Sequence, residues 1–215
     1  MPKEKSGLAP RKTAHQDRAR LRVETILQST KTLLNEHPSH QVNTRMIADH
    51  AGISIGSLYQ YFPKKEAIFY ELFRQWLEAT LAELDRVNDS LSPDATYEEC
   101  VEAFLRGLTN PELNSQSNWK LRFAMSSSKE LAALEEKHKV EVAARVHKIK
   151  QQFGSSPPPE LAMPMLLLQN EYTVASLITL SHMAGTPFEE KMYQMCKKLL
   201  LIVFDYDRWE NLPAG

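Results

Sequence analysis

The sequence is poor in glycine and cysteine, and it has no long uninterrupted apolar run. Only 7 of its 215 residues are glycine, and the alternation of apolar and polar residues typical of strands is hard to find. Cys100 and Cys196 lack both CxxC spacing and clustered histidines, so we expect buried free thiols in a reducing cytoplasm. No apolar run reaches the roughly eighteen residues needed to span a membrane. These absences, with 42% apolar residues, predict an all-α fold with a sizeable core.

Sequence motifs for catalysis are also missing. The chain contains no HExxH, P-loop, GxSxG or GxGxxG pattern. Adjacent acidic residues such as Glu135 and Glu136 fall on a charged helical face. A catalytic site needs a placed nucleophile, an acid/base pair or a metal set. We therefore predict that the chain is not an enzyme and that it holds neither a metal ion nor a resident cofactor.

The formal net charge of −1 conceals two parts of opposite sign. Residues 1–65 carry 11 lysines and arginines against 5 acidic residues, whereas residues 66–215 carry 15 against 22. A protein that displaces counterions from DNA needs positive charge near the phosphates. The distribution favours a nucleic-acid contact within the first 65 residues and argues against one elsewhere.

Residues 1–14 are basic and polar, and we expect them to form a flexible arm. They contain no apolar core, so they do not have the pattern of a secretory signal. Two interpretations remain open, namely a solvated tail and an arm that contacts DNA.

Residues 44–65 have the pattern of two short helices joined by a tight turn. Thr44 is a candidate N-cap of the first helix, and Ser54 is a candidate N-cap of the second. Gly52 stands between them, where a left-handed backbone conformation is often needed. The apolar face of the first helix would consist of Met46, Ile47, His50 and Ala51. Leu58 and Phe62, four residues apart, would form the buried edge of the second.

The opposite face of the second short helix combines small, amide and aromatic side chains. Gly56 costs about 1 kcal/mol relative to alanine inside a helix. A residue without a side chain is expected there if DNA must come close. Two helices of this kind, followed by lysines, are typical of a helix-turn-helix that lays one helix in the major groove of DNA. An ordinary helical hairpin is the alternative.

This segment resembles the DNA-binding domain of the TetR family of bacterial repressors, over roughly residues 18–73. The resemblance lies in the Ala-Gly-Ile-Ser turn at residues 51–54, the Gly-Ser-Leu-Tyr-Gln-Tyr-Phe helix at residues 56–62, and the Lys-Glu-Ala-Ile sequence at residues 65–68. Two positions depart from the usual pattern, because Ile53 replaces valine and Ile68 replaces leucine. The resemblance covers about a quarter of the chain.

The resemblance implies DNA contacts along this segment. Thr44, Tyr59 and Lys65 match positions that hold phosphates, and the groove-facing positions with their flanking residues are Arg45, Ser54, Ile55, Gly56, Ser57, Gln60, Tyr61 and Lys64. Arg45 could reach a guanine edge and Gln60 an adenine edge. Arg45 could instead be a solvated helix residue, and Tyr61 could belong in part to the core.

The rest of the chain alternates apolar periodic segments with breakers, which predicts about nine helices in all. The predicted domains are the helix-turn-helix at 15–65 and a ligand-binding and dimerisation bundle at 66–215. Three prolines at 157–159 cannot continue a helix, so we place a linker at 154–159. Besides the two short helices, we expect helices at 15–36, from 63 or 64 to 91, 96–109, 117–127, 129–153, 160–184 and 188–209.

The predicted helix at 188–209 contains the run Leu199–Phe204, which is apolar on every side. One face can pack within its own domain, and the other must be buried against something else. A second copy is the simplest partner, and two such helices from each copy would form a four-helix bundle. A helix buried centrally in a monomer is the alternative. The proposed dimer contacts are Leu177, Leu180, Leu200 and Phe204.

In the resembled family the second domain binds a small inducer, which weakens the affinity for the DNA operator. We therefore expect a mostly apolar or aromatic ligand, although the same residues could be ordinary core. The candidate lining residues are Phe104, Trp119, Phe123, Met125, Met165, Gln169 and Tyr172, with Asn170 and His182 as further polar candidates. The sequence thus predicts a cytoplasmic homodimeric repressor that binds a near-palindromic DNA operator. A DNA-binding architectural or regulatory dimer without a ligand is the alternative.

Overall fold

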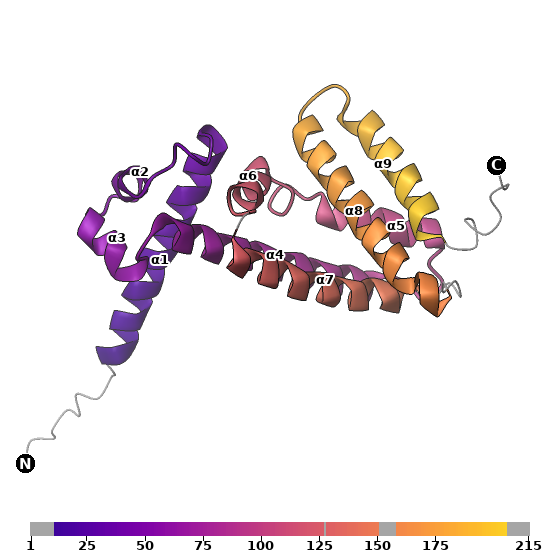
Figure 1. Cartoon of the computed structure of the whole chain (residues 1–215), viewed down its shortest axis with the longest axis horizontal. Helices are drawn as coiled ribbons and strands as arrows, with labels where there is room; N and C mark the ends of the chain where they lie inside the picture. Colours follow the sequence, from indigo (N-terminus) through magenta and orange to yellow (C-terminus); the bar gives the residue numbers. More distant parts are fainter. Residues whose placement is uncertain (1–10, 127, 151–157, 206–215) are drawn as a thin grey trace, which may run out of the picture. The chain divides into compact units, whose positions relative to one another are not determined.

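The computed structural model describes residues 11–126, 128–150 and 158–205, and within these ranges the chain forms nine α-helices and no strand (Figure 1). This architecture confirms the predicted all-α fold. The helices are α1 (Arg11–Glu36), α2 (Thr44–His50), α3 (Ile55–Tyr61), α4 (Lys65–Ser90), α5 (Tyr97–Leu108), α6 (Gln116–Ala124), α7 (Lys129–Lys150), α8 (Pro159–Met183) and α9 (Glu189–Phe204).

The chain divides into two compact units, Met1–Phe69 and Tyr70–Gly215. The boundary falls inside α4, a few residues after the predicted one at residue 65. The first unit therefore contains α1, α2 and α3, and the second contains α5 to α9. We refer to them below as the first and the second unit.

The core of the first unit is small and closely packed. Its fully buried side chains include Ile26 and Leu34 of α1, Ile47 of α2 and Leu58 of α3. Leu21 falls at helical spacing with the apolar residues of α1, but its side chain is 57% exposed. The reason is length: α1 has 26 residues and its partners α2 and α3 have 7 each, so the first turns of α1 extend beyond them.

The predicted arm is shorter than expected, because α1 already begins at Arg11. Residues 11–14 are therefore helical, and residues 1–10 lie outside the described residues. The predicted end of α1 before Pro38 is correct, since the helix stops at Glu36.

The core of the second unit collects apolar side chains from α4 to α9. Fully buried members include Leu84, Leu105 and Leu200, with Trp119 at 4% exposure. The rings of Trp76 and Trp119 meet edge to face, with their centroids 5.0 Å apart. Cys100 and Cys196 are buried free thiols, as predicted, and burial raises the pKa of both.

Two contacts fix the position of α5 in this core. Gly107 lets α5 approach α4 closely, because a Cβ atom there would lie 2.7 Å from Glu83 Oε1 and 2.8 Å from Val87 Cγ2. On the other side, Lys197 of α9 lies 2.9 Å from Glu102 of α5. A capping box of Thr96 and Glu99 stands at the start of α5.

The helix boundaries agree closely with the sequence pattern where a breaker marks them. Thr96 caps α5, Ser115 caps α6, and Pro159 occupies the first turn of α8. Residues 154–157 of the predicted linker lie outside the described residues, and α8 already begins at Pro159, one residue earlier than predicted. The predicted last residues of the α7 and α9 helices, 151–153 and 206–209, also lie outside the described residues. Among the helices of the described part of the chain, none is long and apolar enough to cross a membrane.

Candidate functional site

The first short helix of the helix-turn-helix is capped by Asn43, not by Thr44. Asn43 has an extended backbone, and its Oδ1 accepts from the amides of Arg45 and Met46 at 3.1 and 3.0 Å. An asparagine side chain reaches these amides one residue earlier than the threonine, so Thr44 becomes the first helical residue. His50, predicted to face inward, is exposed, because the narrow contact with the core is filled by Ile47 and Ala48.

The turn between the two helices follows the predicted pattern. Gly52 has φ of 64°, in the left-handed region that favours glycine. The next amide, that of Ile53, donates to the Ala48 carbonyl at 3.0 Å. Ser54 then caps α3, and its Oγ accepts from the amide of Ser57 at 3.1 Å. The turn and the cap together fix the direction in which α3 leaves α2.

Helix α3 has one buried edge and one exposed face. Leu58 is fully buried and Phe62 is 8% exposed, as predicted. On the opposite side Gly56 and Gln60 are exposed, with Ile55 at 38% and Tyr59 at 49%. The remaining predicted DNA contacts of the segment comprise three exposed residues, Arg45, Ser54 and Lys64, and four half-buried ones, Thr44, Ser57, Tyr61 and Lys65.

Gly56 has no internal reason to be glycine. It lies in regular helix, and a Cβ atom added there would meet no atom within 4 Å among the described residues. By propensity an alanine would be better by about 0.5–1 kcal/mol. The missing side chain of Gly56 therefore leaves open space on the exposed face of α3.

All three predicted phosphate contacts already have hydrogen-bond partners inside the first unit. The hydroxyls of Thr44 and Tyr59 are hydrogen-bonded at 3.1 Å, which joins the start of α2 to the middle of α3. Lys65 Nζ donates to the carbonyls of Val42 and Ser39, at 2.9 and 3.5 Å. The Lys65 ammonium group thus holds the loop before α2 against the start of α4, whereas Lys64 is exposed.

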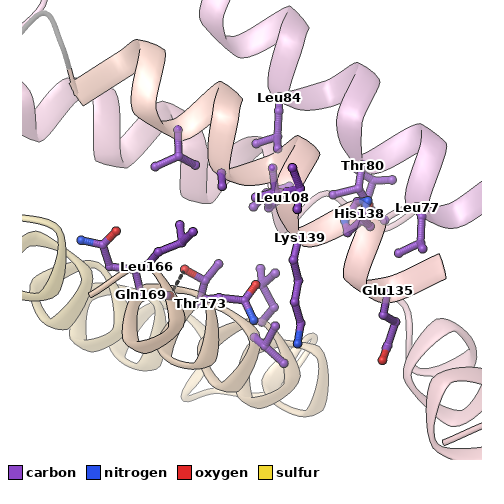
Figure 2. A pocket seen from close by; sticks show the side chains of 18 of the residues that line it. Leu77, Thr80, Leu84, Leu108, Glu135, His138, Lys139, Leu166, Gln169 and Thr173 are labelled. Atoms are coloured by element: carbon purple, nitrogen blue, oxygen red, sulfur yellow. Dashed lines mark hydrogen bonds between the residues drawn. The ribbon is translucent and has the colours of Figure 1, made fainter. Parts of the chain in front are cut away.

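The second unit contains a cavity of about 180 Å³, lined by α4 to α8 and by Phe204 of α9. Most of its lining is apolar, with leucines, valines and the rings of Phe73, Trp76 and Trp119. Figure 2 shows Leu77 and Leu84 on one side and Leu166, Gln169 and Thr173 on the other.

Three of the seven candidate ligand contacts line this cavity, namely Phe104, Trp119 and Gln169, and so does Asn170. The other four do not. Phe123 and Tyr172 are 60% and 41% exposed, and Met125 is buried where α6 ends. Met165 and His182 also lie outside the lining. On α8 the 3.6-residue helical period brings Leu166, Gln169 and Asn170 into the lining and leaves Met165 and Tyr172 out of it.

The polar part of the lining was largely missed from the sequence. It includes Arg122, whose Nε lies 2.6 Å from Glu135 Oε1, and Lys139. His138 also lines the cavity, although the sequence pattern placed it only on the apolar stripe of α7. Its pKa is lowered to about 4, because burial disfavours the charged ring. The alternation of charged and apolar residues along α7 gave no signal that four of the polar ones, from Glu135 to Lys139, line the cavity.

Comparison with known proteins identifies the first unit. A family profile described as bacterial regulatory proteins, tetR family, matches residues 26–72. Over 76 residues the chain is 32% identical to the HTH-type transcriptional regulator RutR of Escherichia coli K12 and to that of Shigella flexneri. Residues 26–72 therefore match the DNA-binding segment of the TetR family. These matches cover 35% of this chain and 36% of the curated relatives, so they span about a third of the relatives' length.

Solved structures resemble this chain over most of its length. A transcriptional regulator of Pseudomonas aeruginosa PAO1 superimposes with a TM-score of 0.66 at 16% identity, covering 84% of this chain and 88% of that one. LfrR of Mycobacterium smegmatis, solved in complex with proflavine, gives 0.62 at 17% identity, covering 85% and 96%. At these identities the likeness shows a shared fold for both units.

Three of the four residues predicted for the dimer contact lie inside the chain's own core, and the fourth, Phe204, is half-buried against it. Leu177, Leu180 and Leu200 are 9%, 5% and 1% exposed, and the ring of Phe204 lies 6.1 Å from that of Phe104. These side chains pack α5, α8 and α9 against one another within the chain, so Leu177, Leu180 and Leu200 offer little surface to a second copy. The exposed apolar residues of α8 and α9 are instead Leu161, Met163, Leu167, Tyr172, Met195, Leu199 and Ile202.

Proposed function

We propose that this chain is a DNA-binding transcriptional regulator that inserts α3 into the major groove. The observation that carries the proposal is the exposed face of α3, where Gly56 leaves open space that no atom of the described chain fills. A helix whose outer surface combines a glycine, Gln60 and Tyr59 fits a groove that is read through base edges and held through phosphates. No catalytic step is part of this function.

The charge distribution supports the same role. The excess of positive charge lies in residues 1–65, which include the helix-turn-helix, and the remainder of the chain is acidic. Phosphate contacts dominate DNA affinity and make it dependent on salt. A protein with this distribution is directed to DNA by its first unit alone, and it acts in the cytoplasm, where bacterial DNA lies.

We further propose that the regulator is a repressor, released from its operator by a small molecule bound in the second unit. The cavity of about 180 Å³ and its largely apolar lining support a ligand site. LfrR, a protein of the same fold, was solved in complex with proflavine. An architectural DNA-binding protein without a ligand would be better served by a filled core, so the cavity favours the ligand-responsive alternative.

A second copy of the chain is the partner that we propose for α8 and α9. Along α9 the exposed apolar side chains Met195 and Leu199 are four residues apart, and Tyr172 is exposed on α8. Pairing of these two helices with their copies would close a four-helix bundle around a twofold axis. A twofold dimer presents two α3 helices, which accounts for a near-palindromic operator.

The test begins with selection of DNA sequences bound by the full-length protein, followed by footprinting. We expect Tyr59→Ala to weaken binding to all sequences, because its hydroxyl supports a phosphate contact. Gln60→Ala should instead change sequence preference at a position within each half-site. Gln28→Ala, at an exposed glutamine of α1, is the matched control and should change neither. A protein that selects no sequence, or whose footprint is indifferent to both variants, would contradict the proposed docking.

The effector part is tested separately, by screening small molecules for release of the selected operator. Coupling between the two sites requires that the ligand bind the free protein more tightly than the DNA-bound protein. Operator binding that no cavity ligand alters would leave the DNA-binding role intact and contradict the inducer.

A further inference from the structure

Most polar groups around the cavity of the second unit already have partners within the chain. Trp76 Nε1 donates to the Leu113 carbonyl at 2.8 Å, and Trp119 Nε1 donates to Asn114 Oδ1 at 2.9 Å. Thr80 Oγ1 donates to the Trp76 carbonyl at 2.9 Å. These groups keep the walls in place, and a ligand would gain little by competing for them.

The polar groups contributed by α6 and α8 are engaged in the same way. Arg122 pairs with Glu135, and Gln169 Nε2 donates to the Val203 carbonyl at 3.2 Å. Thr173 Oγ1 donates to the carbonyl of Gln169 at 2.8 Å (Figure 2). The position of α8 against α9 thus depends on groups that also form the cavity wall.

His138 differs from these groups. It lines the cavity, and its Nδ1 is buried without a hydrogen-bond partner among the described residues. In Figure 2 the ring points from α7 toward the side formed by α4, near Thr80. A buried polar atom without a partner costs free energy, so a ligand group that reached Nδ1 would recover it. Because burial lowers the pKa of His138 to about 4, the ring is neutral near pH 7.

The charges around the cavity are balanced. The lining contains two basic residues, Arg122 and Lys139, and two acidic residues, Glu135 and Glu136, so it favours neither a cation nor an anion by net charge. Lys139 extends from α7 toward α8, and no carboxylate of the described residues lies within 4.0 Å of its Nζ. A lysine can cover apolar surface with its stem and keep its ammonium group in water. Attraction of an acidic ligand by Lys139 is the competing possibility.

The size of the cavity limits the ligand. An apolar cavity of about 150 Å³ is enough to bind benzene, and this one has about 180 Å³. A molecule with one or two aromatic rings therefore fits, and the rings of Trp76 and Trp119 provide aromatic surface.

We infer that the cavity binds an uncharged aromatic molecule bearing a hydroxyl group, and that this hydroxyl hydrogen-bonds to Nδ1 of His138. A hydroxyl both donates and accepts, so it satisfies Nδ1 in either tautomer of the neutral ring. The inference rests on the proposed function only in treating the cavity as the effector site. Binding itself can be measured on the free protein.

Calorimetric titration of the full-length protein with 2-naphthol, naphthalene and 2-naphthoate at pH 7.5 tests this inference. The three probes share a ring system and differ in the polar group. We expect 2-naphthol to bind about tenfold more tightly than naphthalene, as one recovered hydrogen bond predicts. We expect the anionic 2-naphthoate to bind most weakly. A Kd for naphthalene equal to or below that for 2-naphthol, tightest binding of 2-naphthoate, or binding of none of the three would overturn the inference.

Variants assign the effect to the imidazole. His138→Leu should abolish the preference for 2-naphthol over naphthalene, whereas His138→Asn should keep part of it, because the asparagine amide lies near the position of Nδ1. Lys139→Met is the matched control on the same helix and should leave the preference unchanged. If Lys139→Met removes the preference and His138→Leu does not, the inference is wrong. Should His138→Leu not fold, the three probes on the unchanged protein and on His138→Asn still decide.

The operator assay separates this inference from the proposed function. If 2-naphthol binds through His138 but does not release the operator, the ligand class stands and the inducer role fails. If the operator is bound normally and none of the probes binds the free protein, the ligand class fails and the DNA-binding role stands.

Discussion

The first unit carries its candidate site on the outside, whereas the second carries its candidate site within its core. On α3 the functional face is made of residues that the fold itself does not need, such as Gly56 and Gln60. Around the cavity the same tryptophans and leucines both build the core and would contact a ligand. The outer face can change without loss of the fold, and the cavity cannot.

This difference explains why one site could be read from the sequence and the other could not. A glycine in a helix is unfavourable, so its presence indicates a demand from outside the fold. A leucine or tryptophan in a core position satisfies the hydrophobic effect whether or not a ligand is present. In the second unit the informative signal is a polar atom without a partner, and only the three-dimensional structure reveals it.

The largest predicted effect is that a substitution in the second unit weakens DNA binding by the first unit. Leu199→Arg places a charge on the 41%-exposed apolar residue of α9 that we assign to the dimer contact. We expect sedimentation to show a monomer, with circular dichroism unchanged. Operator affinity should fall roughly 100- to 10,000-fold, because a monomer binds one half-site of the operator, whereas a dimer binds both at once.

Gln194→Arg is the control for this prediction, since it adds the same charge to the exposed polar side of α9. It should leave both the dimer and the operator affinity intact. An unchanged dimer in Leu199→Arg would show that this face of α9 is not the contact between copies.

The second prediction concerns the interior of the second unit and its response to acid. The pKa of His138 is lowered from 6.5 to about 4, mainly by burial, with Arg145 and Arg122 also lowering it and Glu135 and Glu141 opposing them. The unfolded chain therefore binds a proton below pH 6.5 that the folded chain does not. Stability is fully present above pH 6.5 and falls toward pH 4, by about 3 kcal/mol in all.

Urea unfolding followed by tryptophan fluorescence measures this loss, because all three tryptophans of the sequence follow residue 69. Paired carboxylates also lose stability in acid, so the useful quantity is the difference between the protein and His138→Leu at each pH. The free energy of unfolding of the protein, minus that of His138→Leu, should fall steadily as the pH drops from 6.5 to 4. A difference that stays constant would mean that the ring takes up its proton equally in the folded and unfolded chain.

The sequence predicted the fold well where turn-forming and helix-capping residues mark the ends of the helices. Gly52, Ser54, Thr96 and Pro159 each stand at the turn or helix start that their chemistry favours. It failed where neighbouring residues compete for one role, since Asn43 and not Thr44 caps α2. The sequence also could not tell which face of α9 packs within its own chain, because a helix that is apolar all round gives no sign of it, and Leu200 is buried.

The third prediction separates two adjacent lysines, Lys64 and Lys65, which the sequence analysis both assigned to DNA contacts. Lys65→Met removes an ammonium group bonded to the carbonyls of Val42 and Ser39, so we expect the first unit to lose about 1–2 kcal/mol of stability. Lys64 is exposed, and Lys64→Met should leave stability unchanged while reducing the slope of log K against log salt by about 1.

Hydrogen exchange of the α2 and α3 amides measures the first effect, and operator titrations at several salt concentrations measure the second. A Lys65→Met protein with normal exchange and a reduced salt slope would instead assign Lys65 to a phosphate, as the resemblance implies. The two lysines then share a role, and the carbonyl contacts of Lys65 would matter little.

The smallest predicted effect has opposite signs in the free and bound protein. Gly56→Ala should stabilise the first unit by about 0.5 kcal/mol, because alanine favours helix and its Cβ meets nothing within 4 Å. The same methyl group occupies the open space against which DNA is proposed to pack, so operator affinity should fall roughly five- to tenfold. Thermal unfolding and operator titration on one preparation measure both. A variant that is more stable and binds DNA normally would show that DNA does not occupy the space at Gly56. The main observation in favour of α3 as the DNA-binding surface would then be lost.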